Sequence, residues 1–215
     1  RLAEPVSGVT IATLRQWAAE FQFAITGSYV ACDEEVDANK NAVPIPDKSY
    51  YNRAFFLTPE GEAYYYDKRH LFRMGQETKH SQRPVISYRG WNILLLVCYD
   101  LRFPVWSRNV NNEYDLLIYV ANWPVPRRRV WDILLQARAL ENISYVCGVN
   151  RIGTDGNQML YNGGSVIYSP KGDLLASVPD HEEGTATATL DLSVLREFRQ
   201  KFPAWKDAEC FQIKN

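Results

Sequence analysis

Three short, strongly apolar runs constrain the fold more than any other feature of the sequence. They span residues 91–97, 114–121 and 143–149, and each has the length of a buried strand rather than of a membrane span. Between the second and the third run, residues 130–142 carry apolar side chains at helical spacing. Buried strands connected through a helix predict an α/β fold, with a sheet covered by helices.

The same patterns predict the other elements of the chain. Further helices are expected at 11–21, with Leu14, Trp17, Ala18 and Phe21 on one face, and at 194–202, capped by Ser193. In the helix at 130–142, the apolar residues at helical spacing are Val130, Ile133, Leu134, Ala137 and Leu140. Further strands are expected at 24–32, 51–57, 63–68, 84–88, 163–168, 174–178 and 185–192. Surface loops are expected at 33–48, 75–82 and 153–162.

Length and composition place limits on the class of protein. The 215 residues suit a single domain, 1–215, and a net charge of -1 gives no general attraction for nucleic acid or a membrane surface. The four cysteines and three histidines are not spaced as metal ligands. We therefore expect no metal, no nucleic-acid partner and no membrane span, and reduced thiols in a cytoplasmic protein.

Cys98, which ends the first apolar run, has two interpretations. A thiol in such a place is more often a core residue, as Cys147 in the third run illustrates. However, Asp100, Arg102 and Pro104 follow at once, and charged groups at a strand end usually line a cleft. Cys98 is therefore also a candidate nucleophile at the carboxyl end of a buried strand, where open α/β sheets place their sites.

Lys68 likewise ends an aromatic strand and has two interpretations. Its ammonium could simply reach solvent from a strand end. Near a thiol, it would instead favour the thiolate and stabilise a developing oxyanion.

Several motifs, in order along the chain, resemble the nitrilase superfamily of carbon–nitrogen hydrolases. Residues 97–104 (VCYDLRFP) resemble its nucleophile motif, and residues 66–72 (YDKRHLF) resemble its lysine motif. Shorter matches are YNR at 51–53, ANWP at 121–124, RALEN at 138–142 and GGS at 163–165. Within the superfamily, residues 68–74 and 98–109 resemble the ω-amidase branch, whose members hydrolyse the terminal amide of short 2-oxo dicarboxylic acid monoamides.

The resemblance implies an α/β, four-layer α-β-β-α sandwich and a Glu-Lys-Cys triad without a cofactor. Cys98 matches the nucleophile, Lys68 the lysine and Glu77 a second, supporting glutamate, while the N–H of Tyr99 would help to bind the oxyanion. The family's first strand and its general-base glutamate match nothing in this sequence, so we expect the domain to be N-terminally incomplete, and Glu4 is not assigned that role.

The resemblance further implies an amidase that releases ammonia from a small, carboxylate-bearing amide such as 2-oxoglutaramate or 2-oxosuccinamate, through a cysteine thioester. Arg102 would bind the carboxylate, although an ion pair with Asp100 or another acid is the structural alternative. Trp123 would form a wall of the substrate site or be a core residue. Family members commonly dimerise, so a homodimer or higher homo-oligomer is expected. Alternatives are another amidase or carbamoyl hydrolase of the family, a silent binding homologue, and a structural subunit with a buried cysteine.

Overall fold

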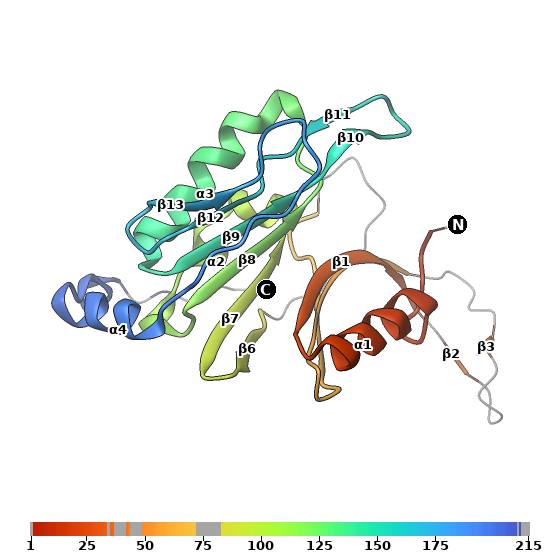
Figure 1. Cartoon of the computed structure of the whole chain (residues 1–215), viewed down its shortest axis with the longest axis horizontal. Coiled ribbons are helices and arrows are strands. Elements are labelled where there is room, and N and C mark those ends of the chain that lie inside the picture. Colours follow the sequence, from red (N-terminus) through yellow and green to blue (C-terminus); the bar gives the residue numbers. More distant parts are fainter. Residues whose placement is uncertain are drawn as a thin grey trace. The chain divides into compact units, whose positions relative to one another are not determined.

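The computed structural model describes residues 2–33, 35–36, 42–43, 49–71, 83–209 and 211. The chain divides into two compact units, Arg1–Pro84 and Val85–Asn215, which are drawn in Figure 1. Each unit has a sheet and a hydrophobic core of its own.

The first unit is built on a three-stranded antiparallel sheet with the order β1-β4-β5. A core of Ile11, Phe55 and Leu57 joins its helix α1 to this sheet, as the packing of α1 beside β1 in Figure 1 illustrates. The elements of this unit are α1 (Val9–Phe21), β1 (Ile25–Cys32), β2 (Glu35–Val36), β3 (Ala42–Val43), β4 (Tyr50–Leu57) and β5 (Ala63–Asp67).

Helix α1 begins and ends close to its predicted bounds, but its buried face is narrower than predicted. Ile11 and Ala18 are buried, and Leu14 packs against the core of the unit. Trp17 and Phe21, which were expected on the same face as Leu14 and Ala18, are exposed.

The second unit is built on a six-stranded sheet with the order β13-β12-β9-β8-β7-β6. Its three central strands, β7 (Trp91–Val97), β8 (Leu116–Ala121) and β9 (Tyr145–Asn150), are parallel. Their continuous apolar runs reflect burial on both faces, as expected for parallel strands. The strands at both edges, β6 (Val85–Tyr88) on one side and β12 (Val166–Tyr168) with β13 (Leu174–Ser177) on the other, pair antiparallel.

Short helical turns and one hairpin lie between these strands. The predicted loop at 153–162 instead contains a hairpin of two short strands, β10 and β11. The remaining elements of the unit are η1 (Cys98–Arg102), α2 (Pro104–Ser107), η2 (Val110–Asn112), η3 (Val125–Arg127), α3 (Arg128–Asn142), β10 (Ile152–Thr154), β11 (Leu160–Asn162), α4 (Leu192–Lys201) and η4 (Ala204–Asp207), where η denotes a 3₁₀ helix.

Helix α3 lies along one face of the six-stranded sheet (Figure 1). Trp131 and Leu135 face Gly148 of β9, which has no side chain to hold the helix away. The apolar residues at helical spacing are not all buried, since Ile133 and Leu140 of α3 are about half exposed. The buried positions are Trp131, Leu135, Arg138, Ala139 and Asn142, two of them polar.

The C-terminal part of the unit corrects two further predictions. Residues 185–191 form no strand, since they pair with no other strand in the described part of the chain. Helix α4 is capped by Asp191 rather than by Ser193, because the Asp191 carboxylate accepts hydrogen bonds from the N–H groups of Ser193 and Val194. Leu195 of α4 packs with Ile143 and Tyr145 at the amino end of β9.

The parallel pairing brings the carboxyl ends of β7, β8 and β9 to the same edge of the sheet. Val97 pairs with Val120, and Ala121 pairs with Asn150. The residues that follow these positions, Cys98, Asn122 and Arg151, therefore leave the sheet side by side. Among the described residues, no helix is long and apolar enough to cross a membrane.

Candidate active site

Cys98 lies at the sharp turn by which the chain leaves β7. It is the first residue of η1 and has a φ of 48°, a left-handed conformation that residues other than glycine rarely adopt. Its side chain is partly exposed, and its Sγ lies 3.8 Å from the carbonyl oxygen of Asn122. A nucleophile on a strained turn between a strand and a helix is presented away from the sheet edge, where a substrate can reach it.

Asp100 stabilises this turn from within and does not line a cleft. Its carboxylate is fully buried and accepts a hydrogen bond of 3.0 Å from the N–H of Val97. The expectation that the charges after Cys98 face a cleft was therefore wrong for Asp100. A buried carboxylate needs such donors, and the turn that presents Cys98 supplies one.

Arg102, in contrast, is exposed and stacks on an aromatic ring. Its guanidinium carbon lies 5.6 Å from the centre of the Trp123 ring. In the described part of the chain, no ion pair joins Arg102 to Asp100. The guanidinium therefore remains at the surface of the second unit, a position that suits a contact with an anion.

Trp123 has the environment of a core residue. It is 2% exposed, its ring lies 5.5 Å from that of Trp131, and its indole N–H donates to the carbonyl of Arg127. The contact with Arg102 is nevertheless a route by which Trp123 could act on a substrate, because the ring orients the guanidinium. Its predicted role in substrate binding stays a prediction.

Asn150 organises the sheet edge beside Cys98, and the sequence did not single it out. Its amide oxygen accepts from the N–H of Trp123 at 2.7 Å. Its amide nitrogen donates to the carbonyls of Trp123 and Gly163 at 2.9 and 2.7 Å. The only signal in the sequence is an amide residue that directly follows an apolar run.

The Gly-Gly-Ser segment that resembles the family serves a structural role at this edge. The Ser165 hydroxyl accepts from the N–H of Asn150 and donates to its carbonyl. Gly164 has a φ of 85°, and a Cβ there would lie 2.4 Å from the Arg128 side chain. This segment therefore holds the carboxyl end of β9 rather than presenting a reactive group.

Lys68 lies in the first unit, directly after β5. Its side chain is 4% exposed, so the alternative of an ammonium in solvent is wrong. Its N–H donates to the carbonyl of Asn52. One residue earlier, Asp67 accepts two hydrogen bonds from Arg53, at 2.6 and 2.8 Å, and this ion pair raises the pKa of Arg53. The predicted role of Lys68 beside Cys98 stays a prediction.

The other candidate residues and the remaining thiol have distinct environments. Glu77 lies outside the described residues. Tyr99 packs edge-on against Phe103, with ring centres 5.2 Å apart. Burial raises the pKa of the Cys147 thiol to about 11, which suits a structural thiol. No cluster of three or more potential metal ligands occurs within the described residues.

Comparison with known proteins places the chain in a family. The family model for carbon–nitrogen hydrolases matches residues 1–200. The chain is 51% identical, over 166 residues, to the ω-amidase YafV of Escherichia coli K12, a match that covers 75% of this chain and 64% of that protein. It is 43% identical to YafV of Yersinia enterocolitica over 204 residues, or 93% of this chain and 74% of that protein. The 2-oxoglutaramate amidase of Bacillus subtilis is 34% identical over 163 residues, 73% of this chain and 62% of that protein.

Solved structures show the same relationship. XC1258 from Xanthomonas campestris, a CN-hydrolase superfamily protein with an arsenic adduct in its active site, is 37% identical with a TM-score of 0.85. That similarity covers 99% of this chain and 79% of the Xanthomonas chain. An amidase from Nesterenkonia sp. AN1, solved with acrylamide added to its active-site cysteine, is 26% identical with a TM-score of 0.71, over 90% of this chain and 73% of that chain.

These matches confirm the predicted α/β, nitrilase-like fold, and they extend over nearly the whole chain. The sequence spans slightly less than two thirds of the length of the Escherichia coli relative. The chain belongs to the carbon–nitrogen hydrolase family.

Proposed function

We propose that the protein is an amidase that hydrolyses the terminal amide of a small, carboxylate-bearing substrate such as 2-oxoglutaramate and releases ammonia. The observation that carries the proposal is the placement of Cys98, a partly exposed thiol on a strained turn at the carboxyl edge of the parallel strands. The similarity to ω-amidases and to a 2-oxoglutaramate amidase supports both the reaction and the substrate class.

In the proposed reaction, the Cys98 sulfur attacks the amide carbon and its thiol proton passes to a general base. The resulting tetrahedral intermediate carries its negative charge on oxygen, which Lys68 and the N–H of Tyr99 would stabilise. Tyr99 directly follows the nucleophile in the first turn of η1, which is where such enzymes commonly take an oxyanion-binding N–H from. Collapse of the intermediate breaks the carbon–nitrogen bond, and ammonia leaves with the returned proton.

The second half of the reaction regenerates the thiol. Water, deprotonated by the same base, attacks the thioester carbon and displaces the Cys98 sulfur, which regains its proton as the acid product leaves. We assign the general base to no residue of this sequence. Glu77 takes the supporting role that its match to the family implies, next to the lysine motif. The reaction needs no metal and no organic cofactor.

Arg102 provides the proposed selectivity for a carboxylate. A guanidinium binds a carboxylate through two parallel hydrogen bonds, and the Trp123 ring below Arg102 limits the directions in which this fork can point. The substrate would thus be bound at its carboxylate end by Arg102, with its amide end at Cys98. Both residues belong to η1 of the second unit, which directly follows β7.

We further propose that the protein acts in the cytoplasm as a homodimer or higher homo-oligomer. The described cysteines form no disulfide, which supports the cytoplasmic location. Members of the family commonly dimerise, which supports the oligomer. Size-exclusion chromatography with light scattering tests the second: a monomeric mass across the working concentration range would disprove it.

Ammonia release by the intact gene product tests the proposed activity. The wild type should release ammonia from 2-oxoglutaramate, Cys98→Ala should release none above background, and Cys147→Ala should keep most of the wild-type rate. Cys147 is the matched control because it is a cysteine of the same sheet with no proposed role. No release by a folded wild type from 2-oxoglutaramate or 2-oxosuccinamate would disprove the proposal and favour a silent binding homologue.

A further inference from the structure

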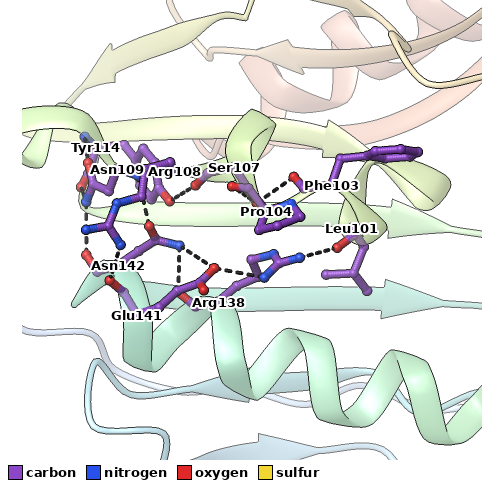
Figure 2. Close-up of polar contacts among 10 residues, drawn as sticks. All are labelled: Leu101, Phe103, Pro104, Ser107, Arg108, Asn109, Tyr114, Arg138, Glu141 and Asn142. Carbon is purple, nitrogen blue, oxygen red and sulfur yellow. Dashed lines mark hydrogen bonds and ion pairs between the residues drawn. The ribbon is translucent and has the colours of Figure 1, made fainter. Parts of the chain in front are cut away.

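We propose that Arg138 is a positioning residue for the nucleophile, which acts by holding the turn that carries Cys98. The proposal rests on the proposed function, since it concerns the same thiol. Arg138 lies in the last turns of α3 and is 3% exposed. Figure 2 shows its guanidinium between the main chain of Leu101 and the carboxylate of Glu141.

Two hydrogen bonds fix the Arg138 side chain. Its Nη2 donates to the carbonyl oxygen of Leu101 at 2.7 Å, and its Nη1 donates to Oε1 of Glu141 at 2.8 Å. Leu101 lies three residues after Cys98 in the same 3₁₀ helix. A buried charge is tolerated only when its hydrogen-bond partners are in place. The turn must therefore keep the Leu101 carbonyl directed at Arg138, or the guanidinium loses an acceptor.

A second contact fixes the far end of the segment that follows Cys98. The Asn142 amide oxygen accepts from the N–H of Asn109 at 2.8 Å, and Asn109 donates to the carbonyls of Tyr114 and Asn142. Arg108 donates to the carbonyl of Glu141 at 2.8 Å. Figure 2 shows these contacts around the same end of α3. The segment is thus attached to one rigid helix end at both Leu101 and Asn109.

The attachment matters because the conformation of Cys98 is unfavourable in itself. A residue other than glycine at a φ of 48° is strained, and the strain persists only where the surroundings determine it. Asp100 holds the turn on the strand side through Val97, and Arg138 holds it on the helix side. Without Arg138, the turn would relax and move the sulfur relative to the amide carbon.

Such a displacement should affect the chemical step more than substrate binding. A misplacement of about 1 Å at the reacting atoms costs on the order of 100-fold in rate. Arg138 is buried in the protein and would not contact the substrate, so KM should change little. The signature of a positioning role is therefore a fall in kcat, and in the rate of Cys98 alkylation, at nearly constant KM.

The test compares Arg138→Met, Arg138→Lys and a matched control, Arg199→Met, in the intact protein. Arg199 is also buried and donates to the carbonyls of Ile143 and Tyr114 and to Asp115. These partners precede β8 and β9, at the opposite end of the parallel strands from Cys98. The measurements are kcat, KM and the second-order rate of iodoacetamide alkylation of Cys98, read by peptide mass spectrometry below each variant's unfolding temperature.

Arg138→Met should lower kcat and the Cys98 alkylation rate about 10- to 100-fold, with KM within about threefold of the wild type. Arg138→Lys should recover part of this loss, since an ammonium can reach one of the two acceptors. Arg199→Met should lower the unfolding temperature but leave both rates near the wild-type values. Should Arg138→Met not fold, Glu141→Gln weakens the same guanidinium contact and should lower both rates about threefold or more.

Two results would overturn the inference. One is a wild-type kcat and a wild-type alkylation rate in Arg138→Met, or in Glu141→Gln if Arg138→Met does not fold. The other is an equal loss of both rates in Arg199→Met, which would show a general effect of lost stability. Neither result resembles failure of the proposed function itself, in which the wild-type protein would release no ammonia.

Discussion

The Cys98 thiol lies 3.8 Å from the carbonyl oxygen of Asn122, across the boundary between β7 and β8. This contact joins the turn after one parallel strand to the turn after its neighbour. A carbonyl in that position can accept the S–H of the resting thiol and so orient the sulfur. The next residue, Trp123, is in turn held by Asn150 from β9. Three strand ends are therefore connected around one sulfur atom.

Replacing Asn150 by Ala should destabilise the second unit strongly. The change removes three hydrogen bonds at once and leaves the N–H of Trp123 and two carbonyls without their partner. We expect the free energy of unfolding in urea to fall by about 3 kcal/mol. Asn150→Asp keeps an acceptor for Trp123, but it places a buried carboxylate oxygen against the Trp123 and Gly163 carbonyls, so its loss should be at least as large. A loss below about 1 kcal/mol in Asn150→Ala would show that the network contributes little.

Replacing Arg102 by Ala should change substrate selectivity rather than the chemical step. Loss of a charge-assisted pair of hydrogen bonds should raise KM for 2-oxoglutaramate about 10- to 100-fold, with kcat changed far less. The KM of Arg102→Lys should lie between those of the wild type and Arg102→Ala, because an ammonium carries the charge but lacks the planar fork. The control substrate is a neutral amide of similar length such as butyramide, whose KM should not change. Equal effects on both substrates would instead indicate a structural role for Arg102.

The thiols of Cys98 and Cys147 should differ sharply in reactivity. With its pKa raised by burial to about 11, Cys147 is roughly one part in a thousand thiolate at pH 8. Iodoacetamide should therefore label Cys98 in the native protein much faster than Cys147, although both thiols are partly exposed. Rapid native labelling of Cys147, at a rate equal to that of Cys98, would contradict this difference in environment.

The same pKa shift predicts a loss of stability at alkaline pH. The ordinary pKa of the thiol is 9.0, below the folded value of about 11. Between these two values the unfolded chain loses the Cys147 proton first, so the free energy of unfolding falls as pH rises. Below pH 9 the contribution of Cys147 to the free energy of unfolding is constant. Because burial also raises the pKa of Tyr119, the wild type should be compared with Cys147→Ala, which should show a shallower fall between pH 9 and 11.

Gly148→Ala should show how closely α3 packs on the sheet. A Cβ at Gly148 would lie 2.4 Å from Leu135 and 2.9 Å from Trp131, and both side chains are fully buried. We expect an overpacking cost of about 1–3 kcal/mol in denaturant unfolding. The matched control is Gly156→Ala, where a Cβ meets no atom within 4 Å and stability should barely change. Equal stabilities of the two variants would contradict the close approach of the helix.

The sequence predicted the positions of the helices and strands better than it predicted which of their side chains are buried. The apolar runs became the parallel strands β7, β8 and β9, because continuous hydrophobicity over a few residues is typical of strands buried on both faces. The stretch at 185–192 has strand-like alternation but pairs with nothing in the part of the chain that the structure describes. Whether a strand finds a partner depends on tertiary contacts, which a local pattern does not contain.

The spacing of apolar residues did not identify the buried side chains of α3, for a related reason. Ile133 and Leu140 are exposed, whereas Arg138 and Asn142 are buried. Each of these two polar side chains has a backbone partner more than 30 positions away, the N–H of Asn109 for Asn142 and the carbonyl of Leu101 for Arg138. Asp100 was misjudged in the same way, since its partner is the N–H of Val97. Buried polar groups are predictable only when their partners are known.

Stepwise alkylation of Cys98 shows whether this thiol is the nucleophile. Iodoacetamide is added in increments to the intact protein, and both residual ammonia release from 2-oxoglutaramate and modification of the Cys98 peptide are measured at each step. Activity should fall in proportion to Cys98 modification, reach zero at one equivalent, and be protected by substrate. Full modification of Cys98 with amidase activity retained would contradict the assignment.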